Sequence, residues 1–90
     1  MYTLEASTQF KKDFKTLSEA DGKKVETALG ILEETGTLPY DPYLTLRLKG
    51  KYRDNIEAHL RPDLLLIWYE KVEDTIKLVR VGSHSKLFKK

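Results

Sequence analysis

Cysteine is absent from the 90-residue chain, and glycine and proline are scarce, at five and three residues. The missing cysteines exclude disulfides, thiolate nucleophiles, iron–sulfur clusters and cysteine zinc sites, and they suit a reducing compartment. Few glycines and prolines, with 40% hydrophobic and 33% charged residues, argue against a disordered or low-complexity chain. Any catalysis must therefore use oxygen and nitrogen groups on a small globular protein.

Long apolar runs are also lacking. The longest, Leu64 to Tyr69, has six residues, whereas a membrane-spanning helix needs about 20. The N-terminal residues contain no basic stretch followed by an apolar one, so no secretory signal is indicated. We therefore expect a cytoplasmic protein with no membrane partner. The length predicts a single domain that covers residues 1–90.

Charge is nearly balanced overall but unevenly distributed. The formal net charge is +2. Residues 1–40 carry five basic and seven acidic groups, a net −2, and residues 41–90 carry eleven and seven, a net +4. The second half is therefore the part suited to an anionic partner such as RNA.

Hydrophobic spacing predicts a strand and two helices in the first half. Residues 2–6 alternate and are rich in strand formers. A helical stripe follows, made by Phe10, Phe14 and Leu17. A second helical pattern begins after residues 21–22 and ends at Gly36, where a glycine can stop a helix.

The second half changes to the two-residue period of strands. Residues 36–45 contain two of the three prolines and are expected to form a loop. Strands are predicted at about 51–60, 64–69 and 75–81, with short connections that favour antiparallel pairing. The predicted fold is α+β: an N-terminal strand and a two-helix hairpin precede a three-stranded antiparallel meander, and the helices pack on one face of the twisted sheet.

Four polar residues are expected to meet at one end of this meander. His59 and Asp63 flank the first turn, and Arg80 and His84 lie at the end of the last strand. Because antiparallel neighbours place the start of one strand beside the end of the other, Asp63 should approach Arg80 and His84.

Two imidazoles, a carboxylate and a guanidinium in one cleft can cut RNA without a metal. One group takes the proton of a ribose 2′-OH, another protonates the departing 5′-oxygen, and a cation stabilises the charge on the phosphoryl oxygens. Histidine suits both proton roles because its ordinary pKa is about 6.5. Arginine suits the phosphate because its planar fork matches the phosphate oxygens.

Each residue also has a plainer interpretation. His59 would then face solvent, His84 would serve a turn or cap, and Asp63 would form the turn. Arg80 lies in an apolar strand and needs a partner or an anion, and a salt bridge to Asp63 would satisfy it. A metal site formed by His59, Asp63 and His84 is a further alternative, although the sequence predicts no metal and no cofactor.

Basic residues gather just before the meander and again at its first turn. Such a strip can follow phosphates, and the tyrosine within it can stack on a base. A solvated edge strand that resists aggregation would carry the same charges. The candidate RNA-binding residues are Lys49, Lys51, Tyr52, Arg53 and Arg61.

Three segments together resemble a known toxin family. They are LKGKYR at 48–53, EAHLRPDLLLIWY at 57–69 and RVGSHSKLF at 80–88, and STQFKKD at 7–13 is also typical. The combination of His-x-x-x-Asp with Arg-x-Gly-x-His-x-x-Leu-Phe resembles the YafQ-like branch of the RelE/ParE toxin superfamily, over nearly the whole chain.

The resemblance implies the toxin of a bacterial type II toxin–antitoxin pair. Such a toxin would be an mRNA interferase, a ribosome-dependent endoribonuclease that cleaves mRNA in the ribosomal A site. The family's catalytic residues would fall on His59, Asp63, His84 and Phe88, and Arg80 matches the arginine of its last strand. The implied partners are a cognate antitoxin that wraps the toxin, the ribosome and mRNA.

One position departs from the family pattern. YafQ-like toxins usually carry another histidine two residues before the Leu-x-Gly motif, and this chain has Leu46 there. Either the remaining groups suffice, or the activity is reduced or altered. Two alternatives therefore stay open: a ParE-like inhibitor of DNA gyrase, which requires no acid–base set, and a catalytically weak module that only binds its antitoxin.

Overall fold

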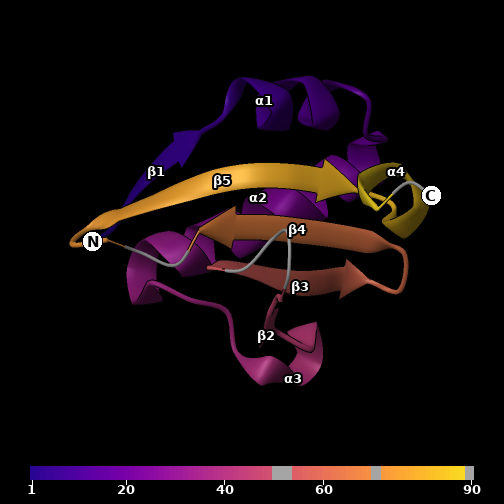
Figure 1. Ribbon diagram of the computed structural model, residues 1–90. Helices are drawn as coiled ribbons and strands as arrows, with labels where there is room; N and C mark the ends of the chain where they lie inside the picture. The colour runs from indigo at the N-terminus through magenta and orange to yellow at the C-terminus, as the bar shows by residue number, and fades with distance from the viewer. Residues whose placement is uncertain (50–53, 70–71, 89–90) are drawn as a thin grey trace.

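The computed structural model describes residues 1–49, 54–69 and 72–88 and contains a five-stranded sheet with helices (Figure 1). The strand order is β1-β5-β4-β3-β2, in which β1 runs parallel to β5 and the other neighbours are antiparallel. The predicted α+β class and the antiparallel meander are therefore confirmed. In chain order the elements are β1 (Thr3–Ala6), α1 (Thr8–Lys15), α2 (Glu19–Thr35), α3 (Tyr40–Tyr43), β2 (Leu46–Arg47), β3 (Asn55–Arg61), β4 (Leu64–Tyr69), β5 (Thr75–Gly82) and α4 (His84–Leu87).

Helix α2 begins earlier than the sequence pattern predicted. Ser18 caps it, because the Ser18 Oγ accepts the N–H of Asp21 at 3.1 Å. Acidic residues in the first turn, Glu19 and Asp21, suit the positive end of the helix dipole. Asp21 and Gly22, which were expected to precede the helix, therefore lie inside it.

Gly36 ends α2, as predicted, in a conformation that favours glycine. Its φ is 85°, and its N–H donates to the Leu32 carbonyl at 2.9 Å. A Cβ at this position would lie 2.8 Å from the ring carbon Cζ of Tyr2. The Tyr2 N–H also donates to the Glu33 carbonyl at 2.8 Å, so the end of α2 is fastened to the chain just before β1.

Three short elements were not predicted. The expected loop at 36–45 contains α3, and β2 then pairs with β3. Helix α4 follows Gly82, where only a sharp exit was expected. Single helical turns and a two-residue strand hold too few residues to show a hydrophobic period. Strand β3 begins at Asn55, and the first residues of the predicted strand, 51–53, lie outside the described part of the chain.

Strand β4 is buried on both faces, as its continuous apolar run predicted. One face carries the main core, where α1 and α2 pack against the sheet. Its buried residues include Phe10, Val25, Ala28, Leu32, Leu66, Trp68, Ile76 and Leu78. The other face carries a smaller cluster of Leu65, Ile67 and Leu87, which seats α4 on the sheet. No helix in residues 1–49, 54–69 and 72–88 is long and apolar enough to cross a membrane.

Two glycines of the same helix provide a matched test of the αL cap. Gly36→Ala should lower the free energy of unfolding by about 2 kcal/mol, because a side chain at positive φ is strained and would meet the Tyr2 ring. Gly30→Ala should raise it by about 0.5–1 kcal/mol, because Gly30 is exposed inside α2 with no heavy atom within 4 Å of an added Cβ. Urea unfolding measures both. Equal effects of the two substitutions would contradict this account of the helix end.

Candidate active site

Helix α4 and the β3–β4 turn lie at the same end of the sheet (Figure 1), and Asp63, His84 and Phe88 are in contact there. Asp63 occupies the two-residue turn between β3 and β4. Its Oδ1 accepts the backbone N–H of His84 at 3.0 Å. The imidazole of His84 lies 5.0 Å from the ring of Phe88, centroid to centroid. The predicted approach of Asp63 to His84 is therefore present in the structure, and both side chains are exposed.

The position of His84 follows from the start of α4. Ser83 caps this single turn, because its Oγ accepts the N–H of Lys86 at 3.2 Å. Leu87 is buried against the outer face of the sheet with Leu65. His84 is the first residue of α4. The backbone that carries its side chain is therefore held by the Ser83 cap, by the packing of Leu87 and by the hydrogen bond to Asp63.

His59 lies on β3, in cross-strand register with the residues that precede α4. It pairs with Leu65 on β4, and Leu65 pairs with Gly82 on β5, so the His59 backbone is about 10 Å from that of Gly82 at the usual strand spacing. Its Nδ1 is buried and has no hydrogen-bond partner among the described residues. His59 also lines a pocket of about 420 Å³ with Pro42, Tyr43, Leu44, Leu60, Arg61 and Pro62.

Leu46 lies near His59, at the position where the family usually has a histidine. It belongs to β2 and pairs with Glu57, two residues before His59 on β3. Its side chain is 46% exposed. The replacement therefore puts an apolar group where a further polar group would have faced the site.

The prediction that Arg80 approaches Asp63 is wrong. It pairs with Ile67, four residues beyond Asp63, and the register shifts there because Trp68 pairs with Leu78, which leaves Val79 as an extra residue. The guanidinium binds Asp13 of α1 instead, with Nε 2.7 Å from Oδ2 and Nη2 3.1 Å from Oδ1. The salt bridge that the sequence suggested for Arg80 therefore has a different carboxylate.

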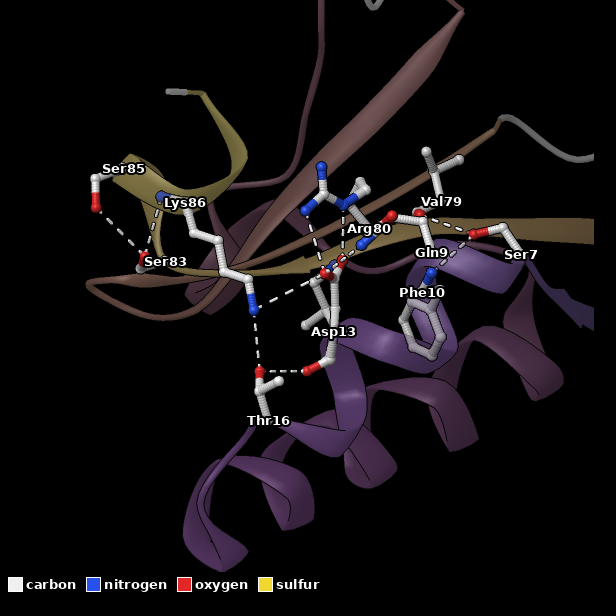
Figure 2. A network of polar contacts seen from close by, with 11 residues as sticks. Ser7, Gln9, Phe10, Asp13, Thr16, Val79, Arg80, Ser83, Ser85 and Lys86 are labelled. Atoms are coloured by element: carbon white, nitrogen blue, oxygen red, sulfur yellow. Dashed lines mark hydrogen bonds and ion pairs between the residues drawn. The ribbon is translucent and has the colours of Figure 1, made fainter. Parts of the chain in front are cut away.

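Asp13 is buried, with 1% of its surface exposed. Besides Arg80, its carboxylate accepts the N–H of Val81 at 3.1 Å and the side-chain amide of Gln9 at 3.1 Å (Figure 2). Burial raises the pKa of Asp13, but the hydrogen bonds from Arg80, Val81 and Gln9 outweigh it and hold the pKa below its ordinary value of 3.8. Sequence analysis missed this residue, although it falls within the helical stripe, three positions after Phe10.

The predicted RNA-binding residues have different surroundings. Arg61 is paired with Asp21 of α2, with Nε 2.8 Å from Oδ1 and Nη2 2.9 Å from Oδ2. The hydrogen bond from Arg61 lowers the pKa of Asp21. Lys49 is exposed. Three of these residues, Lys51, Tyr52 and Arg53, lie outside the described part of the chain.

Among the described residues, no group of ligating side chains supports the alternative hypothesis that His59, Asp63 and His84 form a metal site. Within the described ranges, no three or more histidine, cysteine, aspartate or glutamate side chains are grouped so that they could hold a metal ion. The arrangement instead offers an exposed carboxylate and an exposed imidazole on one hydrogen-bonded scaffold, with a second imidazole two strands away. Such groups can move protons.

The buried carboxylate should make stability depend on acid pH. Asp13→Asn should lower the free energy of unfolding at pH 7 by about 3 kcal/mol, because Arg80 loses its charged partner. A carboxyl whose folded pKa is lowered stabilises the fold above its unfolded pKa, and this contribution is lost as pH falls through the folded value. The difference between wild type and variant should therefore be constant down to about pH 4 and shrink below it. Urea unfolding across this range is the measurement, and a difference that grows in acid would contradict it.

Comparisons with known proteins agree with the fold. A sequence model of the family described as "Bacterial toxin of type II toxin-antitoxin system, YafQ" matches residues 2–89. A search of curated protein sequences finds no significant match.

Solved structures cover almost the whole chain. A metal-bound toxin from Helicobacter pylori is 42% identical, with a TM-score of 0.83 over 98% of this chain and 100% of that chain. YafQ from Escherichia coli strain BL21(DE3) is 28% identical, with a TM-score of 0.80 over 98% of this chain and 99% of that chain. A chain of the E. coli DinJ–YafQ toxin–antitoxin complex is 29% identical, with a TM-score of 0.81 over 97% of each chain. The chain therefore belongs to the YafQ family of bacterial toxins from type II toxin–antitoxin systems.

Proposed function

We propose that this toxin is an mRNA interferase, a ribosome-dependent endoribonuclease that works by acid–base chemistry without a metal. The observation that carries the proposal is the hydrogen bond from the His84 N–H to Asp63 Oδ1. It joins the β3–β4 turn to the start of α4 and so holds a carboxylate and an imidazole, both exposed, at one end of the sheet. Proton transfer requires such groups in fixed positions beside the reacting bond.

The proposed reaction is attack by a ribose 2′-OH on the adjacent phosphorus. A base takes the 2′-OH proton as the O2′–P bond forms, and an acid donates a proton to the 5′-oxygen as the P–O5′ bond breaks. The products are a 2′,3′-cyclic phosphate and a 5′-OH. The protein has to position the 2′-OH in line with the leaving oxygen and to stabilise the phosphoryl charge.

We assign His84 as the acid and either His59 or Asp63 as the base. His84 is exposed at the start of α4. Phe88, whose ring lies beside His84, offers an apolar face on which an RNA base can stack. Arg80 would supply positive charge near the phosphate, oriented by its two bonds to Asp13.

A protein antitoxin is the proposed partner outside the ribosome. The similar E. coli toxin has been solved in a DinJ–YafQ toxin–antitoxin complex. We propose that a cognate antitoxin binds this chain in the same general way and covers the end of the sheet that carries Asp63 and His84. RNA and antitoxin would then compete for the same surface.

His84→Ala should reduce cleavage of mRNA on programmed ribosomes by about 10²–10⁴-fold, because a general acid is removed. The measurement in cells is to induce the wild type or His84→Ala and to map new mRNA 5′ ends inside translated frames. Wild-type induction that causes DNA damage without new ends would favour gyrase inhibition, and neither effect would favour an antitoxin-binding module. Full cleavage and full toxicity of His84→Ala would refute the assignment.

Asp63 allows its chemical and structural roles to be separated. Asp63→Asn keeps an oxygen that can accept the His84 N–H but can no longer take a proton, whereas Asp63→Ala loses both functions. If Asp63 is the base, both variants should lose about 10²-fold or more of the cleavage rate. If it only holds α4, Asp63→Asn should stay active, and His59 is then the base.

Added salt should weaken binding of the toxin to ribosomes and RNA. The net +4 of residues 41–90 favours contacts to phosphates, which release counterions when they form. With three or four such contacts, affinity should fall about tenfold or more between about 50 and about 200 mM salt. The inactive His84→Ala variant allows binding to be measured without cleavage. Affinity that does not change with ionic strength would instead indicate a mainly apolar protein interface.

A further inference from the structure

Strand β5 extends beyond the strand that covers its edge. Strand β1 pairs with β5 only as far as Ala6 and Leu78, whereas β5 continues to Gly82. An open edge leaves backbone N–H and C=O groups without partners. The last residues of β5 lead directly into Ser83 and His84, so whatever covers this edge also determines where α4 begins.

Beyond the end of β1, the N-cap residue of α1 and a side chain of α1 form hydrogen bonds with the backbone of β5. The Ser7 N–H donates to the Leu78 carbonyl at 3.0 Å, and the Ser7 Oγ donates to the Val79 carbonyl at 2.9 Å. Asp13 Oδ2 then accepts the Val81 N–H at 3.1 Å. The first turns of α1 thus act as the partner of the end of β5 (Figure 2).

The Asp13 carboxylate is saturated by these contacts. It accepts four hydrogen bonds: two from Arg80, one from Val81 and one from Gln9. A carboxylate has about four lone-pair sites, and only 1% of the Asp13 surface is exposed. Asp13 therefore has neither the exposure nor the acceptor capacity to contact RNA, and any effect on catalysis must act through other residues.

A second contact fastens α1 to the chain beyond His84. Lys86 Nζ donates to Thr16 Oγ1 at 3.0 Å and lies 3.9 Å from Asp13 Oδ1. The Thr16 Oγ1 in turn donates to the Asp13 carbonyl at 2.8 Å. Helix α1 therefore holds the chain on both sides of His84, at 80–81 and at 86, and Asp63 holds it at residue 84.

We infer that Asp13 is a positioning residue for RNA cleavage: by binding Arg80 and Val81 and attracting Lys86, it fixes the start of α4 and with it the imidazole of His84. The inference rests on the proposed function, because it gives Asp13 a role in that reaction. An imidazole displaced by about 1 Å can cost a reaction about 10²-fold. Loss of Asp13 should therefore lower kcat and leave KM nearly unchanged.

The test compares Asp13→Asn and Lys86→Met with wild type. Asp13→Asn should lower kcat for ribosomal mRNA cleavage by about 10- to 100-fold and change KM by less than about threefold. Lys86→Met leaves the buried carboxylate and Arg80 in place, so it should fold as wild type and lower kcat by about three- to tenfold. In both variants the His84 amide should exchange with solvent about tenfold faster. In Lys86→Met, which folds as wild type, the amides of β4 should keep their protection.

Gly36→Ala is the control for general destabilisation. It weakens the end of α2, where the three atoms nearest an added Cβ all belong to the Tyr2 ring near the start of β1. At a temperature where it is as destabilised as Asp13→Asn, it should keep wild-type kcat and wild-type exchange at His84. An equal loss of kcat in Gly36→Ala and Asp13→Asn would overturn the inference.

The exchange measurement separates this inference from the proposed function. If wild-type protein cleaves no RNA, the proposed function fails, yet faster exchange at His84 in Asp13→Asn and Lys86→Met would still support the positioning of α4 by Asp13. Unchanged His84 exchange in both variants would overturn it, whether or not the protein is a ribonuclease.

Discussion

The buried carboxylate of Asp13 joins the parts of the fold that carry the candidate site. A charge removed from water is costly unless hydrogen bonds replace its hydration. Here the donors come from Gln9 on the same helix and from Arg80 and Val81 on β5. Because all these donors must reach one group, they constrain how α1 lies against the end of β5. A buried charge on α1 is thus bound to β5, the strand that precedes His84.

The candidate site follows from that arrangement. Strand β5 delivers the chain to Gly82, Ser83 caps the next turn, and Leu87 seats α4 on the outer face of the sheet. The β3–β4 turn then presents Asp63 to the His84 N–H. The exposed groups that would meet RNA therefore lie in short connections held by a rigid sheet, as is common for functional residues. The one-turn helix has little stability of its own and depends on these contacts.

The sequence predicted the long, regular parts of this structure and the meeting of Asp63 with His84. Both follow from periodicity and from the geometry of adjacent antiparallel strands. It could not predict β2, α3 or α4, which are too short to show a period. It also gave Arg80 the wrong partner, because the extra residue Val79 shifts the register and the true partner, Asp13, lies 67 positions away. The signal was present: an acidic residue in the apolar stripe of a helix and an arginine in an apolar strand each require a charged partner.

The central claim is that the groups at this end of the sheet activate a ribose 2′-OH. Analysis of the ends of RNA cleaved on the ribosome in the presence of EDTA tests it most directly. The account predicts 2′,3′-cyclic phosphate and 5′-OH ends, and no cleavage when the nucleotide before the scissile bond lacks its 2′-OH. Continued cleavage of that deoxy-substituted RNA, or the release of 5′-phosphate ends, would contradict it.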